Sequence, residues 1–307
     1  MSTEGSTRAI IAALAANAGI AAAKFVGFAI TGSSSMLAEG VHSVADTSNQ
    51  GLLLVGQRAA KKEADQLHPF GYGRNRYFYS FVVALVIFTL GSMFALYEGV
   101  QKIRHAGDHG LDSPIVAVAI LVVAICLEGY SFHTAQKESR PLKGDASWWR
   151  FIRSSRSPEL PVVLLEDAGA LIGLVLALAG VGLTMLTGDA VWDGIGTLCI
   201  GILLGLIAIL LIIEMKSLLI GEGATEEEDA ALRAALPGQD VDRVIHMKTQ
   251  YLGPEELLVA AKIAIAPGLG AIEIAHAIDG AEARVRAAVP QARVIYLEPD
   301  IDRGENS

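Results

Sequence analysis

Cysteine, aromatic residues and a basic face are what this sequence has little of. Two of its 307 residues are cysteine, and 6% are aromatic. Cys126 and Cys199 both lie in apolar runs. They fit neither a disulfide framework nor a metal motif, so we expect two small buried apolar residues. No basic face with interleaved aromatics occurs, so nucleic-acid binding has no support.

Signatures of two enzyme classes are also missing. The stretch GYGRNR, residues 71–76, contains glycines and aromatics but lacks the spacing of a phosphate-binding loop. No HExxH-like motif of zinc proteases occurs. A membrane metalloenzyme stays a rival interpretation of any metal ligands in the chain. Turnover of a lipid or peptide substrate would favour it.

Long apolar runs are what the sequence has instead. Hydrophobic residues make up 52% of the chain, and its mean hydropathy is +0.45. About 20 helical residues cross the roughly 30 Å of hydrocarbon in a bilayer. Runs of this kind cover residues 9–30, 33–60, 77–100, 114–132, 162–186 and 191–213. We predict six transmembrane helices. A cleaved signal peptide is the alternative for the first run, which nevertheless continues past its alanines without a mature-domain start.

The net charge of −9 hides a segregation of acidic and basic residues. The connectors after the second and fourth spans are basic, and they contain Arg58, Lys61, Lys62, Arg74 and Arg76, then Lys137, Arg140, Lys143, Arg150, Arg153 and Arg156. The loops on the opposite side hold only Lys102 and Arg104. Positively charged loops stay inside, so both termini are predicted in the cytoplasm. We expect a protein integral to a bacterial cell membrane.

The composition changes at Gly221, so we expect a domain of six transmembrane helices, residues 1–220, and a cytoplasmic domain with an acidic tail, residues 221–307. In the second domain, Thr225 and an acidic first turn indicate the start of a helix. Two strands with alternating apolar residues follow, then an amphipathic helix and a third strand. This order predicts a small α+β domain of ferredoxin-like type.

A polar stripe lies in the second span. Glu39, His42, Asp46 and Asn49 recur at steps of three and four and share one face of a helix. Ionisable groups in a bilayer are costly and need a cavity, a partner or a bound ion. An imidazole and a carboxylate one turn apart suit a divalent metal, although a buried His–Asp hydrogen bond between helices is the alternative. Asn49 is expected to orient its neighbours.

Two adjacent acids, Glu166 and Asp167, lie in the fifth span. Adjacent residues point about 100° apart on a helix, so the two cannot share a face. We expect one of them to face the stripe of the second span, and the sequence leaves open which. Glu98, Glu128 and Glu214 are expected at the membrane interface. Asp193 is expected to be a favourable helix-start charge.

The chain resembles one family of membrane transporters. The stretch AEGVHSVADTSNQ (residues 38–50), the connector HPFGYGR (68–74), six spans and a small α+β tail are together similar to the cation diffusion facilitators. VLLEDAGALIGL (163–174) and the long second connector resemble the branch with the mitochondrial human zinc transporter. The resemblance implies proton-coupled efflux of a divalent cation, usually zinc, by a homodimer whose tails pack together.

The resemblance also implies the ligands. In the family, two residues four apart in span two and two in span five bind the metal. The span-two pair corresponds to His42 and Asp46, and the span-five aspartate to Asp167. The position four residues before it is Val163, where the family has a ligand. Glu166 or a water would replace the missing donor.

Further candidate sites lie in the cytoplasmic segments. Asp65 and His68 match the family's connector site, whereas Tyr72 replaces a later histidine. Arg74 occupies the position of a basic residue that makes a charge contact at the dimer interface, with Asp193 as a suggested partner. The tail candidates are His246, His276, Glu298 and Asp300, while Lys262 and Leu297 stand where histidines often occur. The cytoplasmic zinc sites therefore look degraded.

The expected function is antiport of zinc out of the cytoplasm by alternating access. Deprotonated His42, Asp46 and a span-five carboxylate would bind the metal, and protons would release it by competing for the same lone pairs. The alternatives are manganese, iron or cobalt as the transported ion, or a member that does not transport and whose tail serves as a scaffold.

Overall fold

The computed structural model describes residues 2–31, 34–105 and 114–301. Within these ranges the side chains of residues 2–6, 27–28, 30–31, 34–42, 45–46, 87–88 and 114 are not described. The chain divides into two compact units. One contains the residues up to Ala59 together with Arg76–Lys216. The other contains Ala60–Asn75 and the chain from Ser217 onward. The boundary predicted after residue 220 stays a prediction.

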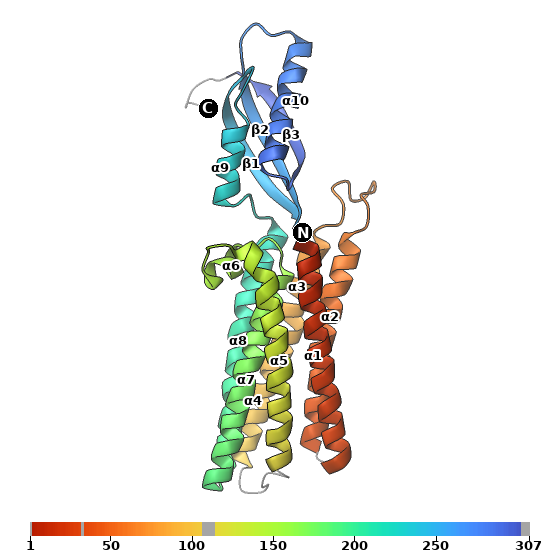
Figure 1. Ribbon diagram of the computed structural model, residues 1–307, viewed down its shortest axis with the longest axis vertical. Coiled ribbons are helices and arrows are strands. Elements are labelled where there is room, and N and C mark those ends of the chain that lie inside the picture. The colour runs from red at the N-terminus through yellow and green to blue at the C-terminus, as the bar shows by residue number, and fades with distance from the viewer. Residues whose placement is uncertain (1, 32–33, 106–113, 302–307) are drawn as a thin grey trace. The chain divides into compact units, whose positions relative to one another are not determined.

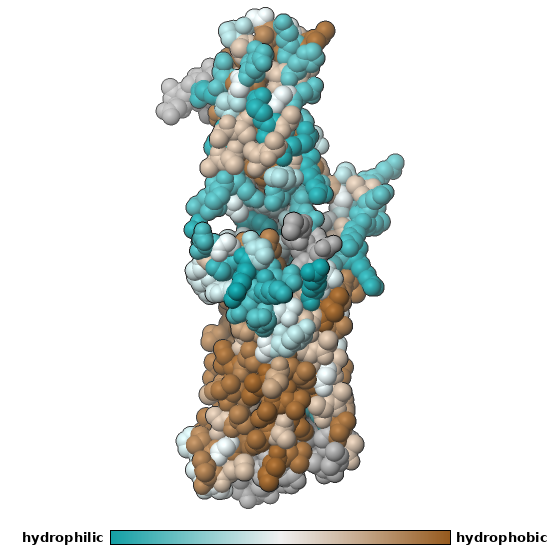
Figure 2. All heavy atoms as spheres, viewed as in Figure 1, coloured by the Kyte–Doolittle hydropathy of each residue, from teal (hydrophilic) through white to brown (hydrophobic). Residues whose placement is uncertain are grey.

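The first unit is a bundle of long helices (Figure 1). Its elements are α1 (Ser2–Thr31), α2 (Ser34–Ala60), α3 (Asn75–Val82), the π-helical segment Val83–Phe88, α4 (Thr89–Arg104), α5 (Pro114–Lys143), α6 (Trp148–Ser154), α7 (Glu159–Thr187) and α8 (Val191–Ile220). Helix α5 contacts α1 and α7, and α1 also contacts α7. Figure 2 shows hydrophobic residues gathered over the visible face of this bundle, as expected for a surface that faces lipid.

Five segments of the described chain are long and apolar enough to cross a membrane: Thr7–Val26, Asn75–Arg104, Ile115–Lys143, Glu159–Thr187 and Val191–Ile220. The remaining predicted span is α2, a helix of 27 residues whose first half carries the polar stripe. The predicted fold class, a helical membrane bundle followed by a small α+β domain, is confirmed.

Two local predictions for the bundle were wrong. The fourth span was expected to end at Phe132, but α5 continues to Lys143, because its polar end is rich in the straight-chain residues that favour helix. The cysteines were expected to be buried, but Cys126 and Cys199 are exposed on the surface of their helices. A thiol is apolar enough for an apolar environment, so an outward position on a span carries little cost.

Helix α8 packs closely on two neighbours through glycines. A side chain at Gly201 would lie 2.9 Å from the backbone nitrogen of Leu96, and the Ser92 hydroxyl donates to the Gly201 carbonyl at 2.7 Å. On the other side, a side chain at Gly196 would lie 3.1 Å from the carbonyl of Leu176. Small residues allow this approach in membranes, where close packing replaces the hydrophobic effect between helices.

The second unit contains α9 (Glu226–Ala235), β1 (Val241–Gly253), β2 (Glu256–Ile265), α10 (Ala271–Ala288) and β3 (Ala292–Asp300). This order is the predicted one. Thr225 caps α9, because its side chain accepts from Glu228 N–H while the Glu228 carboxylate reaches back to the Thr225 backbone. The strands form one sheet in the order β1-β2-β3, antiparallel between β1 and β2 and parallel between β2 and β3.

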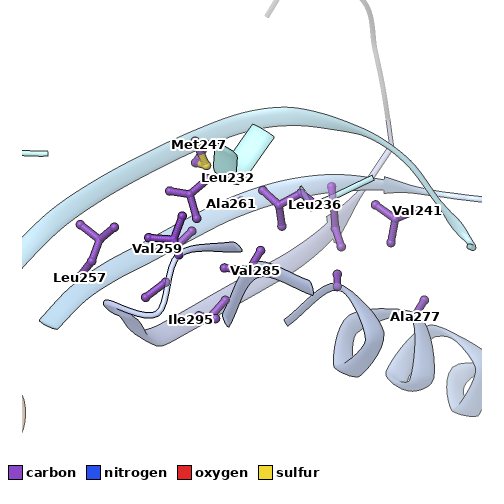
Figure 3. Packing of buried hydrophobic residues seen from close by; sticks show 14 of the residues in the cluster. Leu232, Leu236, Val241, Met247, Leu257, Val259, Ala261, Ala277, Val285 and Ile295 are labelled. Atoms are coloured by element: carbon purple, nitrogen blue, oxygen red, sulfur yellow. The ribbon is translucent and has the colours of Figure 1, made fainter. Parts of the chain in front are cut away.

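The core of this domain lies between one face of the sheet and the helices (Figure 3). Leu232 from α9, Val259 from β2, Val285 from α10 and Ile295 from β3 meet there. The alternation of apolar residues along β2 places its buried side chains on this face, which explains why the strand pattern could be read from the sequence.

Candidate metal site in the helical bundle

The polar stripe lies on α2, as predicted. Helix α2 spans Glu39, His42, Asp46 and Asn49, and helical spacing places these positions on one face. The side chains of the first three lie outside the described residues. Asn49 is described, and it is buried.

Glu166 is the α7 carboxylate that reaches this stripe. Its Oε1 accepts hydrogen bonds from Asn49 Nδ2 at 3.1 Å and from Gln50 Nε2 at 2.7 Å. Gln50 Oε1 in turn accepts from Asn17 Nδ2 at 3.4 Å. Side chains from α1, α2 and α7 therefore form one chain of contacts that ends on a buried carboxylate. The sequence left open whether Glu166 or Asp167 faces the stripe of the second span. Glu166 makes this contact, because its carboxylate accepts from Asn49 and Gln50 of α2.

Asp167 points to a different helix. It has 0% exposure, and the Ser131 hydroxyl of α5 donates to its Oδ2 at 2.7 Å. The carboxyl group of Glu128, also on α5, interacts with it. The predicted divergence of adjacent residues on a helix is confirmed, because α7 presents Glu166 to α2 and Asp167 to α5. The two acids thus link α7 to both neighbours.

Glu128 has 1% exposure and lies beside Asp167, so it faces the inside of the bundle. Its predicted depth at the membrane interface stays a prediction. Ser131 was not singled out at all. A signal existed, because small or polar residues recur along α5 at steps of three and four, and all are buried: Ala124, Glu128, Ser131, Ala135 and Ser139. That stripe is the face α5 turns towards the bundle. Its apolar surroundings concealed the pattern.

A cavity of about 300 Å³ lies within the bundle. Asn17, Asn49, Glu128 and Glu166 line it, and apolar or small residues of α7 and α8 make up much of the remaining wall. Polar groups in such a cavity can exchange a membrane environment for contact with an ion or water. The cavity therefore brings polar residues of α1, α2, α5 and α7 to one space, together with others from α4 and α8.

A second charged group lines the same cavity. Lys102 Nζ on α4 lies 2.9 Å from Asp193 Oδ2 on α8 and 3.6 Å from Glu98 Oε1. Within the chain, Asp193 therefore pairs with Lys102. The contact with Arg74 that the resemblance suggested for a dimer stays a prediction. Glu214 is buried, and Arg153 Nε lies 3.2 Å from its Oε1. The interfacial position expected for Glu214 stays a prediction.

In the first connector, Asp65 is held by the loop itself. Lys62 Nζ and the Tyr72 hydroxyl donate to its Oδ2 at 2.9 and 2.7 Å, and the backbone N–H groups of Leu67 and His68 donate to Oδ1. The Lys62 ammonium, the Tyr72 hydroxyl and the His68 N–H hold the pKa of Asp65 well below its usual range. Metal binding by Asp65 and His68 stays a prediction.

In the tail, two of the candidate metal ligands, Glu298 and Asp300, form ion pairs with a lysine. Lys262 Nζ on β2 lies 2.9 Å from Asp300 Oδ2 and 3.2 Å from Glu298 Oε1, both on β3. Asp300 first, and then Glu298, raises the pKa of Lys262. His246 lies opposite Lys262 in the β1–β2 register. Among the described residues of the whole chain, no three His, Cys, Asp or Glu side chains converge on one metal position.

Known proteins are similar over most of the chain. A family model for the cation efflux transmembrane domain matches residues 10–220. The human mitochondrial proton-coupled zinc antiporter SLC30A9 is 33% identical over 244 residues, 78% of this chain and 42% of the relative. Metal tolerance protein C4 of Arabidopsis thaliana is 32% identical over 265 residues, 84% of this chain and 57% of the relative.

A more distant relative, the magnetosome protein MamB of Paramagnetospirillum magneticum, is 23% identical over 272 residues, 87% of this chain and 85% of the relative. This chain spans about half the length of the human and plant relatives. The resemblance noted from the motifs is confirmed. The chain belongs to the cation efflux, or cation diffusion facilitator, family of membrane metal transporters, near the branch that contains SLC30A9.

Proposed function

We propose that this transporter moves a divalent metal cation, most commonly zinc, out of the cytoplasm in exchange for protons. The observation that carries the proposal is the contact between Asn49 of the α2 stripe and Glu166 of α7 in a cavity of the bundle. It joins the two helices whose acids and histidine are the metal candidates. The similarity to SLC30A9, a proton-coupled zinc antiporter, supports zinc as the ion and protons as the counter-ion.

The proposed ligands are His42, Asp46 and Asp167, with Glu166 as a further donor. Each binds metal only when deprotonated, so protons and metal compete for the same lone pairs. Imidazole has an unperturbed pKa of about 6.5, which lets it exchange a proton near neutral pH. In the inward-open state the metal binds to the deprotonated site. In the outward-open state protons take its place.

The surrounding residues have supporting roles. The amides of Asn49 and Gln50 donate to Glu166 and fix its orientation, and the Ser131 hydroxyl does the same for Asp167. The proposal includes a homodimer formed through the cytoplasmic domain and transmembrane contacts. It also places the protein in a bacterial cell membrane with both termini in the cytoplasm, in accordance with the charge of the connectors.

The test is metal flux in liposomes that contain the purified full-length protein. Zinc, manganese, iron and cobalt are compared with and without a pH gradient. Asp46→Ala should abolish flux, whereas Glu63→Gln, an exposed change in the connector, should leave it unchanged. Zinc flux through Asp46→Ala at the wild-type rate would overturn the site. Flux that ignores the pH gradient would overturn the coupling, and a dominant manganese signal would replace zinc as the ion.

A further inference from the structure

We infer that Glu128 on α5 is an additional ligand of the transported metal, supplying the donor that Val163 cannot. The inference rests on the proposed function and adds a third helix, α5, to a site otherwise assigned to α2 and α7. It concerns one carboxylate that is buried in the bundle and lines its cavity.

The first step is the cost of the pair that Glu128 forms with Asp167. The two side chains have 1% and 0% exposure, and their carboxyl groups interact across the α5–α7 contact. Like charges in a low-dielectric environment repel strongly, so two neighbouring carboxylates require a proton or a cation between them. Such a pair is costly as a purely structural contact, and hydrocarbon side chains would pack there without the penalty.

Two buried oxygens at or near the pair accept no hydrogen bond within the described part of the chain. Asp167 Oδ2 accepts from Ser131, whereas its Oδ1 is buried and accepts no hydrogen bond within the described part of the chain. Asn49 Oδ1 is likewise buried and accepts no hydrogen bond within the described part of the chain, and Asn49 lines the cavity. Buried oxygens usually have hydrogen-bond partners, so these two are suited to a ligand. The Asn49 oxygen lies outside the acidic pair and is therefore an observation independent of it.

The third step is the choice among the carboxylates that line the cavity. Glu98 and Asp193 hold Lys102, which satisfies their charge internally. Glu166 receives two amide donors on one oxygen. Glu128 lines the cavity, and its carboxyl group interacts with that of Asp167. Because Val163 offers no donor, Glu128 is the carboxylate best placed to complete the set around Asp167.

Zinc binding by the purified full-length protein in detergent tests the inference without requiring transport. Glu128→Gln keeps the size of the side chain but removes its charge, and it should raise the zinc dissociation constant at least tenfold by calorimetry. Glu138→Gln, ten residues further along α5, is the matched control and should bind as wild type does. Wild-type affinity in Glu128→Gln would overturn the inference.

A second variant separates ligation from positioning. In a background in which both exposed cysteines are serine, Glu128→Cys should bind cadmium with a thiolate-to-metal charge-transfer band in the ultraviolet, because thiolates prefer soft ions. Glu138→Cys should show no such band. A folded Glu128→Cys protein that binds cadmium without the band would overturn ligation by residue 128. Metal-free melting curves of Glu128→Gln and Glu128→Asp establish that each variant is folded.

The outcomes also distinguish this inference from the proposed function. If Asp46→Ala and Asp167→Asn bind zinc as tightly as wild type, the proposed site itself fails. If these two lose zinc while Glu128→Gln retains it, only the role of Glu128 fails. Loss of affinity in all three, together with the cadmium band, supports both.

Discussion

Arg76, the second residue of α3, holds Glu159, the first residue of α7, in a two-pronged ion pair. The guanidinium donates through Nε to Oε1 and through Nη2 to Oε2, the latter at 2.8 Å, and the side chains have 6% and 1% exposure. The planar fork of arginine matches both carboxylate oxygens, which a lysine cannot do. Glu159 lies two helical turns before Glu166, so the pair fixes the end of the helix that carries both acids.

Removing one partner of this pair should destabilise the bundle strongly. Arg76→Ala leaves a buried carboxylate without its counter-charge, a loss that costs about 3–5 kcal/mol in other proteins. Chemical unfolding in detergent measures the change. Arg76→Lys should recover part of it, and Arg76→Ala combined with Glu159→Ala should be less destabilised than the sum of the single variants. Additive effects would contradict a direct interaction.

The Lys102–Asp193 pair should contribute less. Its members are partly exposed, and ion pairs of this kind are typically worth about 1 kcal/mol or less. A double-mutant cycle with Lys102→Met and Asp193→Asn should give a coupling energy in that range. A coupling as large as that expected for Arg76 and Glu159 would contradict the partial exposure of the pair.

The amide of Gln50 should matter for transport through Glu166. Gln50→Leu removes the 2.7 Å donor and leaves a buried carboxylate oxygen with one amide fewer, a loss of about 1–3 kcal/mol. We expect slower zinc flux and weaker zinc binding. Gln291→Ala, on the exposed surface of the tail, is the control. Unchanged flux and affinity in Gln50→Leu would remove Gln50 from the site.

Asp65 gives the connector a defined pH dependence. Its pKa in the folded state lies below the ordinary 3.8, chiefly because Lys62 donates to it. A lowered carboxyl pKa adds stability that is fully present above the unfolded pKa and is lost as the pH falls through the folded one. The loop should therefore be insensitive to pH above about 5 and loosen in stronger acid. Carbon NMR of labelled aspartates would show the low pKa, and Lys62→Met should raise it. An Asp65 pKa of 3.8 or above in the wild type would contradict the contact.

Local patterns made much of the fold predictable. The contact partners of individual side chains could not be predicted from such patterns. Thr225 marked the start of α9, and alternating apolar residues marked the strands, because caps and side-chain period are local properties. The rotation of α5 that buries Glu128 depends on helices distant in sequence. The grouping of the first connector with the tail depends on such contacts too, because a side chain at Gly73 would lie 3.0 Å from the Cα of Gly253. The periodicity of a single sequence predicts neither the rotation of α5 nor this grouping.

Val163 offers a direct test of metal choice. It is fully buried one turn before Asp167, where the family has a ligand. Val163→His should raise zinc affinity relative to manganese, because imidazole suits zinc whereas carboxylates suit manganese. Val162→His, equally buried but about 100° away around the helix, is the matched control for the strain of a larger side chain. Calorimetry with both ions gives the ratio for each variant. A ratio that changes equally in the two variants would show that position 163 does not face the metal, and the vacancy at this position would then have no bearing on the ion carried.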